Sequence, residues 1–271
     1  STLSASSTPI SVDFGQQAVA QSQQALSNSI ANEATTQTQL GMSNTSLSSE
    51  TFSARESLSQ NTSNSQNWSS AEQKSYSDAQ NTTDQVIENW AQQNGTTSTD
   101  VKSVIASLGV NAMGSGASAG MNLSASAKEE YSNIETLVES DAYTKAIANE
   151  ASYASNLSTK SDSSLTNDES KSLQTGLTNQ TAMIESHASS IKNVESAEER
   201  LSYATQSSST INEKGMDAFY AYQSSQGVDR PTLDQLIIDS NQGSLPAKQH
   251  LNEMMNEYVN SELEYGKNEL R

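Results

Sequence analysis

The chain has 271 residues, of which only 33% are hydrophobic and 5% aromatic, so a broad apolar core is not expected. Its formal net charge of −18 counts against binding to nucleic acid or to anionic membrane surfaces, which would repel it. The chain has no cysteine, which excludes disulfides, thiolate metal sites and cysteine nucleophiles. No apolar run is long enough for a membrane span, and the Ser1 start without a signal-peptide pattern favours a piece of a larger protein.

Helical periodicity is the main structural signal in this Ser-, Gln- and Asn-rich chain. The three prolines and 12 glycines are clustered, and the intervals between them keep a spacing of three or four residues between apolar positions. We therefore predict a mainly α fold: an elongated antiparallel helical bundle or coiled-coil-like rod with a small helical C-terminal cap. Self-association stays open, because a thin helical seam can be completed within the chain or by a second copy.

Residues 1–95 are predicted to form a helix pair. After a loose lead-in, the first helix covers 15–40, and Gly41 lies where a helix stop is expected. A long second helix covers 47–93, with a heptad-type seam that runs from Leu47 through Trp68 to Trp90. Gly95 then ends this helix. Ser, Thr and Asn are poor helix formers, so this long helix needs a partner helix elsewhere in the chain.

Residues 96–127 are predicted to hold a short helix at 101–108 and a Gly/Ala/Ser-rich insert at 109–127. Small and apolar residues alternate in this insert, which fits a short β-hairpin or an adaptable contact loop. Gly/Ser/Ala mixtures are more often flexible linkers, and the composition favours that interpretation.

The rest of the chain is predicted to be helical in two parts. Residues 128–211 form a long helical pair, in which Thr166 or Asn167 caps the second helix ahead of two acidic residues. Residues 212–271 form a compact helical end, which has the densest aromatic cluster of the chain. Pro246 is expected in the first turn of the last helix.

No pattern of residues indicates catalysis or cofactor binding. Neither His187 nor His250 has another ligand at a metal-binding spacing, and the serines lack the sequence contexts of known nucleophiles. The glycines at 114–120 have no following lysine for a phosphate loop, and adjacent acids such as Glu129 and Glu130 point in different directions on a helix. We therefore expect a protein without enzymatic activity, cofactor or metal.

Five aromatic residues are candidates for contact with a partner protein. Trp68 and Trp90 are the only tryptophans, and each either fills the seam between helices or serves as an exposed anchor; their seam positions favour the core. Phe219, Tyr220 and Tyr222 cannot all face one side of a helix, so at least one is expected to be accessible.

Three segments resemble one protein family. VIENWAQQNGTTSTDV at Val86–Val101, the Gly/Ala/Ser-rich patch at 109–127 and GVDRPTLDQLI at Gly227–Ile237 are similar to segments in the C-terminal region of TraG-type proteins of conjugative type IV secretion systems. The resemblance covers most of the chain and includes no catalytic signature.

The resemblance implies a periplasmic region of an inner-membrane protein whose N-terminal spans this chain lacks. It implies roles in mating-pair stabilisation and in exclusion, in which an inner-membrane protein of the recipient recognises the donor's TraG-type region. The partners would be envelope proteins of the plasmid-transfer machinery, and no exclusion residues can be carried over. Two alternatives stay open: a coiled-coil tether of a phage or another secretion apparatus, and a cell-wall hydrolase.

Overall fold

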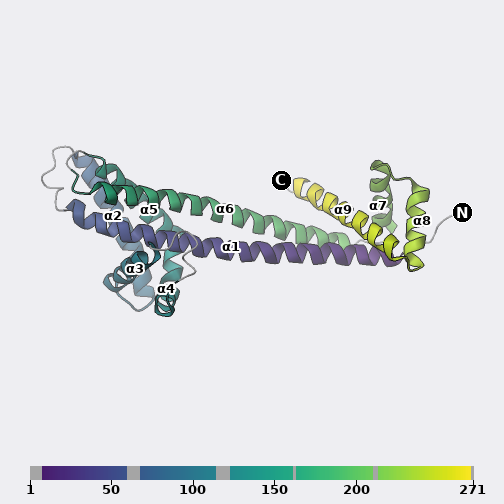
Figure 1. Ribbon diagram of the computed structural model, residues 1–271, viewed down its shortest axis with the longest axis horizontal. Helices are drawn as coiled ribbons and strands as arrows, with labels where there is room; N and C mark the ends of the chain where they lie inside the picture. The colour runs from purple at the N-terminus through teal and green to yellow at the C-terminus, as the bar shows by residue number, and fades with distance from the viewer. Residues whose placement is uncertain (1–7, 60–67, 114–122, 161–162, 210–212, 270–271) are drawn as a thin grey trace. The chain divides into compact units, whose positions relative to one another are not determined.

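A computed structural model describes residues 8–59, 68–160, 163–209 and 213–269, except for 114–122 (Figure 1). The fold is mostly helical, with 89% helix and no strand in the described part of the chain, which confirms the predicted mainly α class. A bundle or coiled-coil shape stays a prediction. The helices are α1 (Thr8–Ser59), α2 (Ser70–Gln93), α3 (Ser98–Met113), α4 (Ala125–Val138), α5 (Asp141–Ser158), α6 (Asn167–Ser209), α7 (Glu213–Ser225), α8 (Arg230–Asn241) and α9 (Leu245–Glu269).

Polar side chains define the helix starts. At α6 the Thr166 hydroxyl accepts from the Glu169 N–H, and the Glu169 carboxylate accepts from the Thr166 N–H, which makes a reciprocal capping box. Ser69, Ser140 and Asp229 cap α2, α5 and α8 in the same way, each accepting from a backbone N–H three residues on. Local sequence therefore sets most of the boundaries that the structure describes.

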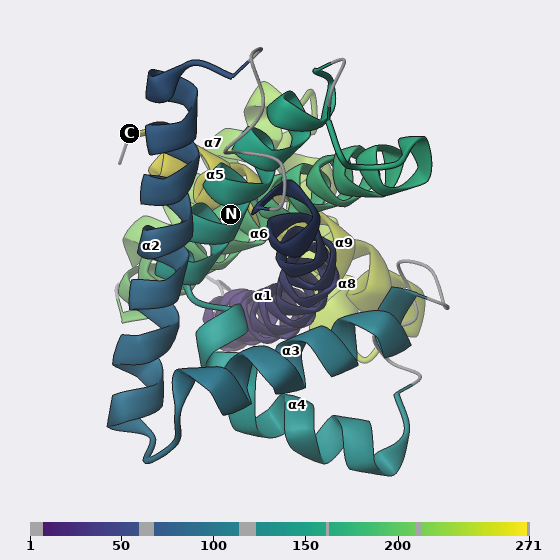
Figure 2. The same ribbon diagram turned by 90° about the vertical axis from the view of Figure 1, so that its left-hand side faces the viewer.

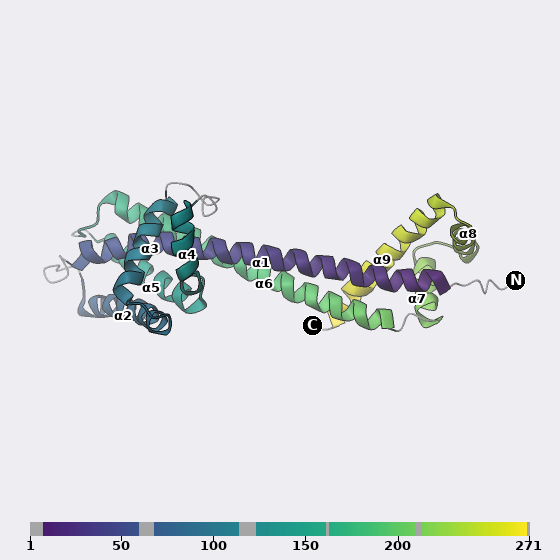
Figure 3. The same ribbon diagram turned by 90° about the horizontal axis from the view of Figure 1, so that it is seen from below.

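The chain divides into two compact units, Glu33–Ser189 and a second unit made of Ser1–Asn32 with Ser190–Arg271. In the first unit, α2, α3, α4 and α5 pack in sequence, and α2 also packs on α5. Figures 2 and 3 show these four helices gathered around the later part of α1. This part of α1 is the centre of the unit.

The later part of α1, residues 40–58, is mostly buried although it is rich in hydroxyls and amides. Thr45, Ser48 and Thr51 are fully buried, and each donates its hydroxyl to the carbonyl four residues earlier. Asn44 donates to the Val138 carbonyl at 2.7 Å and to the Thr144 hydroxyl at 2.8 Å, and it accepts from the Gln180 amide. These bonds satisfy polar groups that would otherwise be costly to bury.

Glycines allow helices to approach closely at three points in this unit. A Cβ on Gly109 of α3 would lie 2.5 Å from Ser49 Cβ and 2.8 Å from the Thr45 carbonyl oxygen of α1. A Cβ on Gly41 of α1 would lie 2.4 Å from the Tyr131 hydroxyl of α4. Gly176 of α6 packs against Leu47 and Glu50 of α1. A larger residue at Gly41 or Gly109 would force neighbouring atoms to shift, whereas at Gly176 a small movement of the Leu47 and Glu50 side chains would be enough.

An ion cluster joins α1, α2, α3 and α5. Arg55 donates to Glu150 from Nε at 2.6 Å and from Nη2 at 2.5 Å, and its Nη1 lies 2.8 Å from Asp84. Lys102 lies 2.8 Å from the same Asp84 oxygen. Glu150 is fully buried, so the bidentate contact with Arg55 is what compensates its charge.

The second unit has an apolar core of larger side chains on α7, α8 and α9. Phe219 and Tyr258 meet edge to face with their ring centroids 5.6 Å apart. The buried members of this cluster are Phe219, Leu233, Ile237, Leu251, Met254, Met255 and Tyr258. These helices lie within the predicted compact end, 212–271.

Three expectations on element boundaries are wrong. The predicted long helix over 47–93 is two helices, because α1 ends at Ser59, Trp68 and Ser69 are not helical, and Ser69 caps α2. Gly41 lies inside α1, where the close approach of Tyr131 requires a residue without a side chain. The first helix of the predicted 128–211 pair is two helices, α4 and α5, separated at Glu139 and Ser140.

The predicted hairpin is also corrected in part. Residues 109–113 of the insert belong to α3, because Gly109 packs on α1 as part of that helix. Residues 114–122 lie outside the described residues. Within the residues that are described, no helix has both the length and the apolar character needed to cross a membrane.

Candidate functional site

Trp68 is part of the core of the Glu33–Ser189 unit. It is 5% exposed and belongs to the same apolar cluster as Leu58 and Tyr76. Its indole N–H is buried and has no acceptor among the described residues. The structure therefore places this contact candidate in the interior, as its seam position indicated.

Trp90 lies at the edge of the same core. It is half-buried near the end of α2, and its indole Nε1 donates to the Thr136 hydroxyl of α4 at 3.0 Å. This hydrogen bond and its packing against the core fix the orientation of the ring. Trp90 is therefore the tryptophan that combines a fixed position with partial access to solvent.

A hollow of about 390 Å³ opens beside Trp90 between α2, α3 and α4. We call it the Trp90 hollow. Apolar side chains and exposed polar side chains share its wall, and the acids come from two different helices. It is lined by Trp90, Asn94, Thr96, Asp100, Val101, Val104, Glu130, Asn133 and Ile134.

The three aromatic residues of the cluster on α7 differ in burial. Phe219 is 2% exposed and belongs to the core, so it is not available to a partner. Tyr220 is half-buried, donates to Asp234 at 2.8 Å and carries the Arg230 guanidinium 4.7 Å from its ring centroid. Tyr222 is half-buried against Tyr258, with ring centroids 5.3 Å apart. At least two of the three residues keep some exposure, as their spacing predicted.

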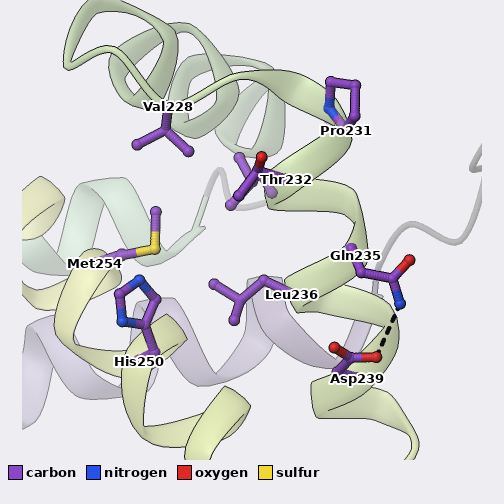
Figure 4. Close-up of a pocket in the computed structure, with 9 residues that line it drawn as sticks. Val228, Pro231, Thr232, Gln235, Leu236, Asp239, His250 and Met254 are labelled. Atoms are coloured by element: carbon purple, nitrogen blue, oxygen red, sulfur yellow. Dashed lines mark hydrogen bonds between the residues drawn. The ribbon is translucent and has the colours of Figure 1, made fainter.

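A second hollow, of about 560 Å³, lies between α8 and α9 in the Ser1–Asn32 and Ser190–Arg271 unit. We call it the α8–α9 groove. In Figure 4, Leu236 of α8 points toward His250 and Met254 of α9, and Gln235 and Asp239 lie at the side, joined by a 2.9 Å hydrogen bond. The full lining is Val228, Pro231, Thr232, Leu233, Gln235, Leu236, Asp239, His250 and Met254.

The two histidines have different surroundings. His187 lies with Nε2 3.0 Å from the Glu33 carboxylate, so it joins α6 to α1 within one unit. His250 is exposed at the α8–α9 groove. The described residues contain no group of three or more His, Asp and Glu side chains placed to hold a metal ion.

Glu50 is the carboxyl group with the most unusual environment. Its Oε2 is buried beside Gly176 without a hydrogen-bond partner among the described residues. Burial raises its pKa from 4.5 to about 7, because the neutral form is favoured where the charge is poorly solvated. The Glu50 carboxyl therefore lies at the contact between α1 and α6. It does not line either of the two hollows.

Sequence reasoning found the aromatic residues but neither hollow. Both hollows lie between helices that are distant along the chain or joined by turns, and their linings follow from tertiary packing. The capping signals Gln93–Gly95 and Asp229–Pro231 did mark the turns beside them. Comparisons of the chain with protein-family models, curated proteins and solved structures found no match.

Proposed function

We propose that this chain is a protein–protein interaction region without enzymatic activity, belonging to a conjugative type IV secretion component and exposed in the periplasm. Its partners are envelope proteins of the transfer machinery, including in exclusion an inner-membrane protein of the recipient. The resemblance of 86–101, 109–127 and 227–237 to TraG-type proteins supplies the biological setting.

The observation that carries the interaction role is the α8–α9 groove. Its lining includes the apolar side chains Leu233, Leu236 and Met254. The polar groups Gln235 and Asp239 bond to each other at the side (Figure 4). Such a lining fits the apolar stripe of a partner helix, a common mode of peptide recognition. Met adds adaptability to a binding surface because its side chain is unbranched and polarizable.

Two of the buried ionisable side chains bond to other side chains of the fold, which is consistent with a protein without enzymatic activity. Glu150 is bonded to Arg55, and Tyr143 is bonded to Ser48. Burial raises the pKa of the Tyr143 hydroxyl well above its usual range. These side chains join helices and stabilise their packing.

The proposal is tested in the gene's own genetic setting. Leu236→Asp together with Met254→Asp is expected to lower the frequency of conjugative transfer by about an order of magnitude or more, because two charges in the groove lining oppose apolar docking. The matched control is Ser224→Asp together with Gln226→Asp, which adds the same charge at exposed positions. Circular dichroism of each purified variant shows whether it is folded.

Unchanged transfer by a folded Leu236→Asp, Met254→Asp variant contradicts the role of the groove. Genes for transfer functions are expected around this gene, and the encoded protein is expected to have several apolar spans before Ser1. The absence of both contradicts the conjugative setting. Turnover of purified cell-wall sacculi by the chain would instead establish the hydrolase alternative.

A structural tether is the second candidate, favoured by the lengths of α1, with 52 residues, and α6, with 43 residues. A tether needs span and helix packing but no specific groove. In that case the groove variant transfers normally, whereas shortening α1 and α6 together by matched helical turns reduces function.

A further inference from the structure

The Trp90 hollow combines an aromatic wall with two acids that lack cationic partners. Asp100 and Glu130 are both exposed, and no ion pair to either carboxylate exists among the described residues. The nearest lysine along α3, Lys102, is held by Asp84 at 2.8 Å. Lys128 is two positions before Glu130 on α4, and residues at that spacing do not face each other. The hollow therefore carries two negative charges that no cation of the described residues pairs with.

The helix geometry brings these groups together. Glu130, Asn133 and Ile134 are three and four residues apart, so they share one face of α4. Asp100 lies in the first turn of α3, where the helix dipole offsets part of its charge. Glu130 lies beyond the first turn of α4 and has no such compensation. The end of α2, which bears Trp90 and Asn94, adds the negative end of a helix dipole to the same hollow.

The wall of the hollow is built to keep its shape. The Trp90 indole is fixed by its bond to Thr136, and the floor residues Val101 and Ile134 are 2% and 4% exposed. Its volume of about 390 Å³ is toward the lower end of the range for small-ligand pockets, roughly 300–1,000 Å³. A single long side chain is therefore an occupant of suitable size.

We propose that the Trp90 hollow binds an arginine side chain of a partner protein. The planar guanidinium stacks on the Trp90 indole, and its N–H groups donate to the Asp100 and Glu130 carboxylates. Arginine is favoured over lysine because it can stack and donate two parallel hydrogen bonds at once. The net charge of −18 attracts a basic segment over longer distances. This site goes beyond the proposed function, because it shares no residue with the α8–α9 groove.

The test uses the indole N–H signals of the whole ¹⁵N-labelled chain. Only two tryptophans exist, so Trp90→Phe assigns both signals. Acetyl-Gly-Arg-Gly-amide is expected to shift the Trp90 signal saturably while the buried Trp68 signal stays in place. The peptide in which neutral citrulline replaces arginine is expected to leave both signals unchanged. Added salt should weaken the arginine effect, because the charges are exposed.

Charge variants complete the test. Asp100→Asn together with Glu130→Gln should weaken arginine binding by roughly tenfold or more, since both charge-assisted bonds are lost. Glu129→Gln together with Asp168→Asn removes two exposed charges elsewhere in the same unit and should leave binding unchanged. The position of the Trp68 signal reports whether each variant is folded.

Three results would overturn the proposal: a Trp90 signal that does not move, equal shifts with the citrulline peptide, or undiminished binding by the folded Asp100→Asn, Glu130→Gln variant. None of these results bears on the α8–α9 groove, whose own variants leave the Trp90 hollow intact. Failure of this inference and failure of the proposed function are therefore separable.

Discussion

The two units of this protein differ in how many polar groups their interiors contain. Around residues 40–58 of α1, buried apolar side chains such as Leu47 and Leu58 alternate with buried polar ones such as Thr45, and hydrogen bonds, an ion pair and close glycine contacts join the helices. In the α7–α9 cluster the core side chains are mostly large and apolar, and the buried carboxylate of Asp234 is bonded by the Tyr220 hydroxyl. A polar interior requires that every group finds its partner, whereas an apolar interior requires mainly that its volume is filled.

The largest effect is expected from Phe219→Ala in the apolar cluster. Phe219 is 2% exposed against Tyr258, and loss of its ring should lower the free energy of unfolding by about 3–5 kcal/mol. Urea unfolding followed by circular dichroism measures the change. Phe219→Leu keeps most of the volume and should cost less than about 1.5 kcal/mol. Equal losses for both variants would show that volume does not control this core.

The corresponding change in the polar interior is Glu150→Ala. It leaves the Arg55 guanidinium with Asp84 as its remaining partner, and a loss of about 3 kcal/mol in unfolding free energy is expected. The double variant Arg55→Met, Glu150→Leu should recover much of that loss, because no buried charge is left unpaired. Urea unfolding of Arg55→Met, of Glu150→Leu and of the double variant measures the coupling. Strictly additive losses would mean that the ion pair is not the source of the effect.

Gly109→Ala tests how tightly α3 packs on α1. The new Cβ would meet the Thr45 backbone oxygen at 2.8 Å, so a shift of one helix should cost about 1–3 kcal/mol of stability. Ser107→Ala on the exposed face of the same helix should change stability by less than about 0.5 kcal/mol. Thermal unfolding of both variants makes the comparison. A stabilised Gly109→Ala variant would contradict the close approach.

The smallest effect concerns Glu50 and pH. Its pKa of about 7 in the folded protein is above its ordinary value of 4.5, so the folded state holds a proton that the unfolded state has lost. Its contribution is therefore present below pH 4.5 and is lost as the pH rises through about 7. The size is about 1–2 kcal/mol after allowance for partial solvent screening.

Glu50→Gln provides the measurement, because the amide resembles the neutral acid and does not titrate. The difference in unfolding free energy between wild type and Glu50→Gln should grow in favour of the variant between pH 5 and about 7.5. Denaturant titrations at several pH values measure this difference, in which the other carboxyl groups cancel. A difference that is independent of pH would contradict the raised pKa. Glu56→Gln is the control on the same helix.

The sequence was sufficient for local features. Thr166 with Glu169, Asp229 ahead of Pro231, and Gly95 at a φ of +68° mark helix ends through bonds to near neighbours, so their signals are readable in the chain. The α1 positions Leu47, Thr51, Ala54 and Leu58 were placed on one buried face, and they are buried. The helical class followed from these patterns.

The predicted seam was wrong where two faces of a helix have similar hydrophobicity. In α2 the predicted row ran through Ser75, Ala79, Thr82, Val86 and Trp90, and of these only Ala79 belongs to the buried row. That row is Tyr76, Ala79, Thr83, Ile87 and Ala91. On α6 the predicted seam residues Ile184 and Ile191 are 37% and 39% exposed. With so many Ser, Thr and Ala residues, neighbouring faces differ little in hydrophobicity, so packing selects between them.

By itself the sequence determined that the protein is helical, that several of its helix ends carry local signals, and that its aromatic residues are densest in 212–271. Only the tertiary structure decided that Gly41 continues a helix, that Gly109 contacts α1, and that Trp90, Asp100 and Glu130 line one hollow. A capping bond joins residues three or four positions apart, so its residues can be recognised in a short stretch of sequence. The packing of one helix against another depends on residues that are distant in the chain. Where these residues are small or polar, the sequence alone does not show which of them are in contact.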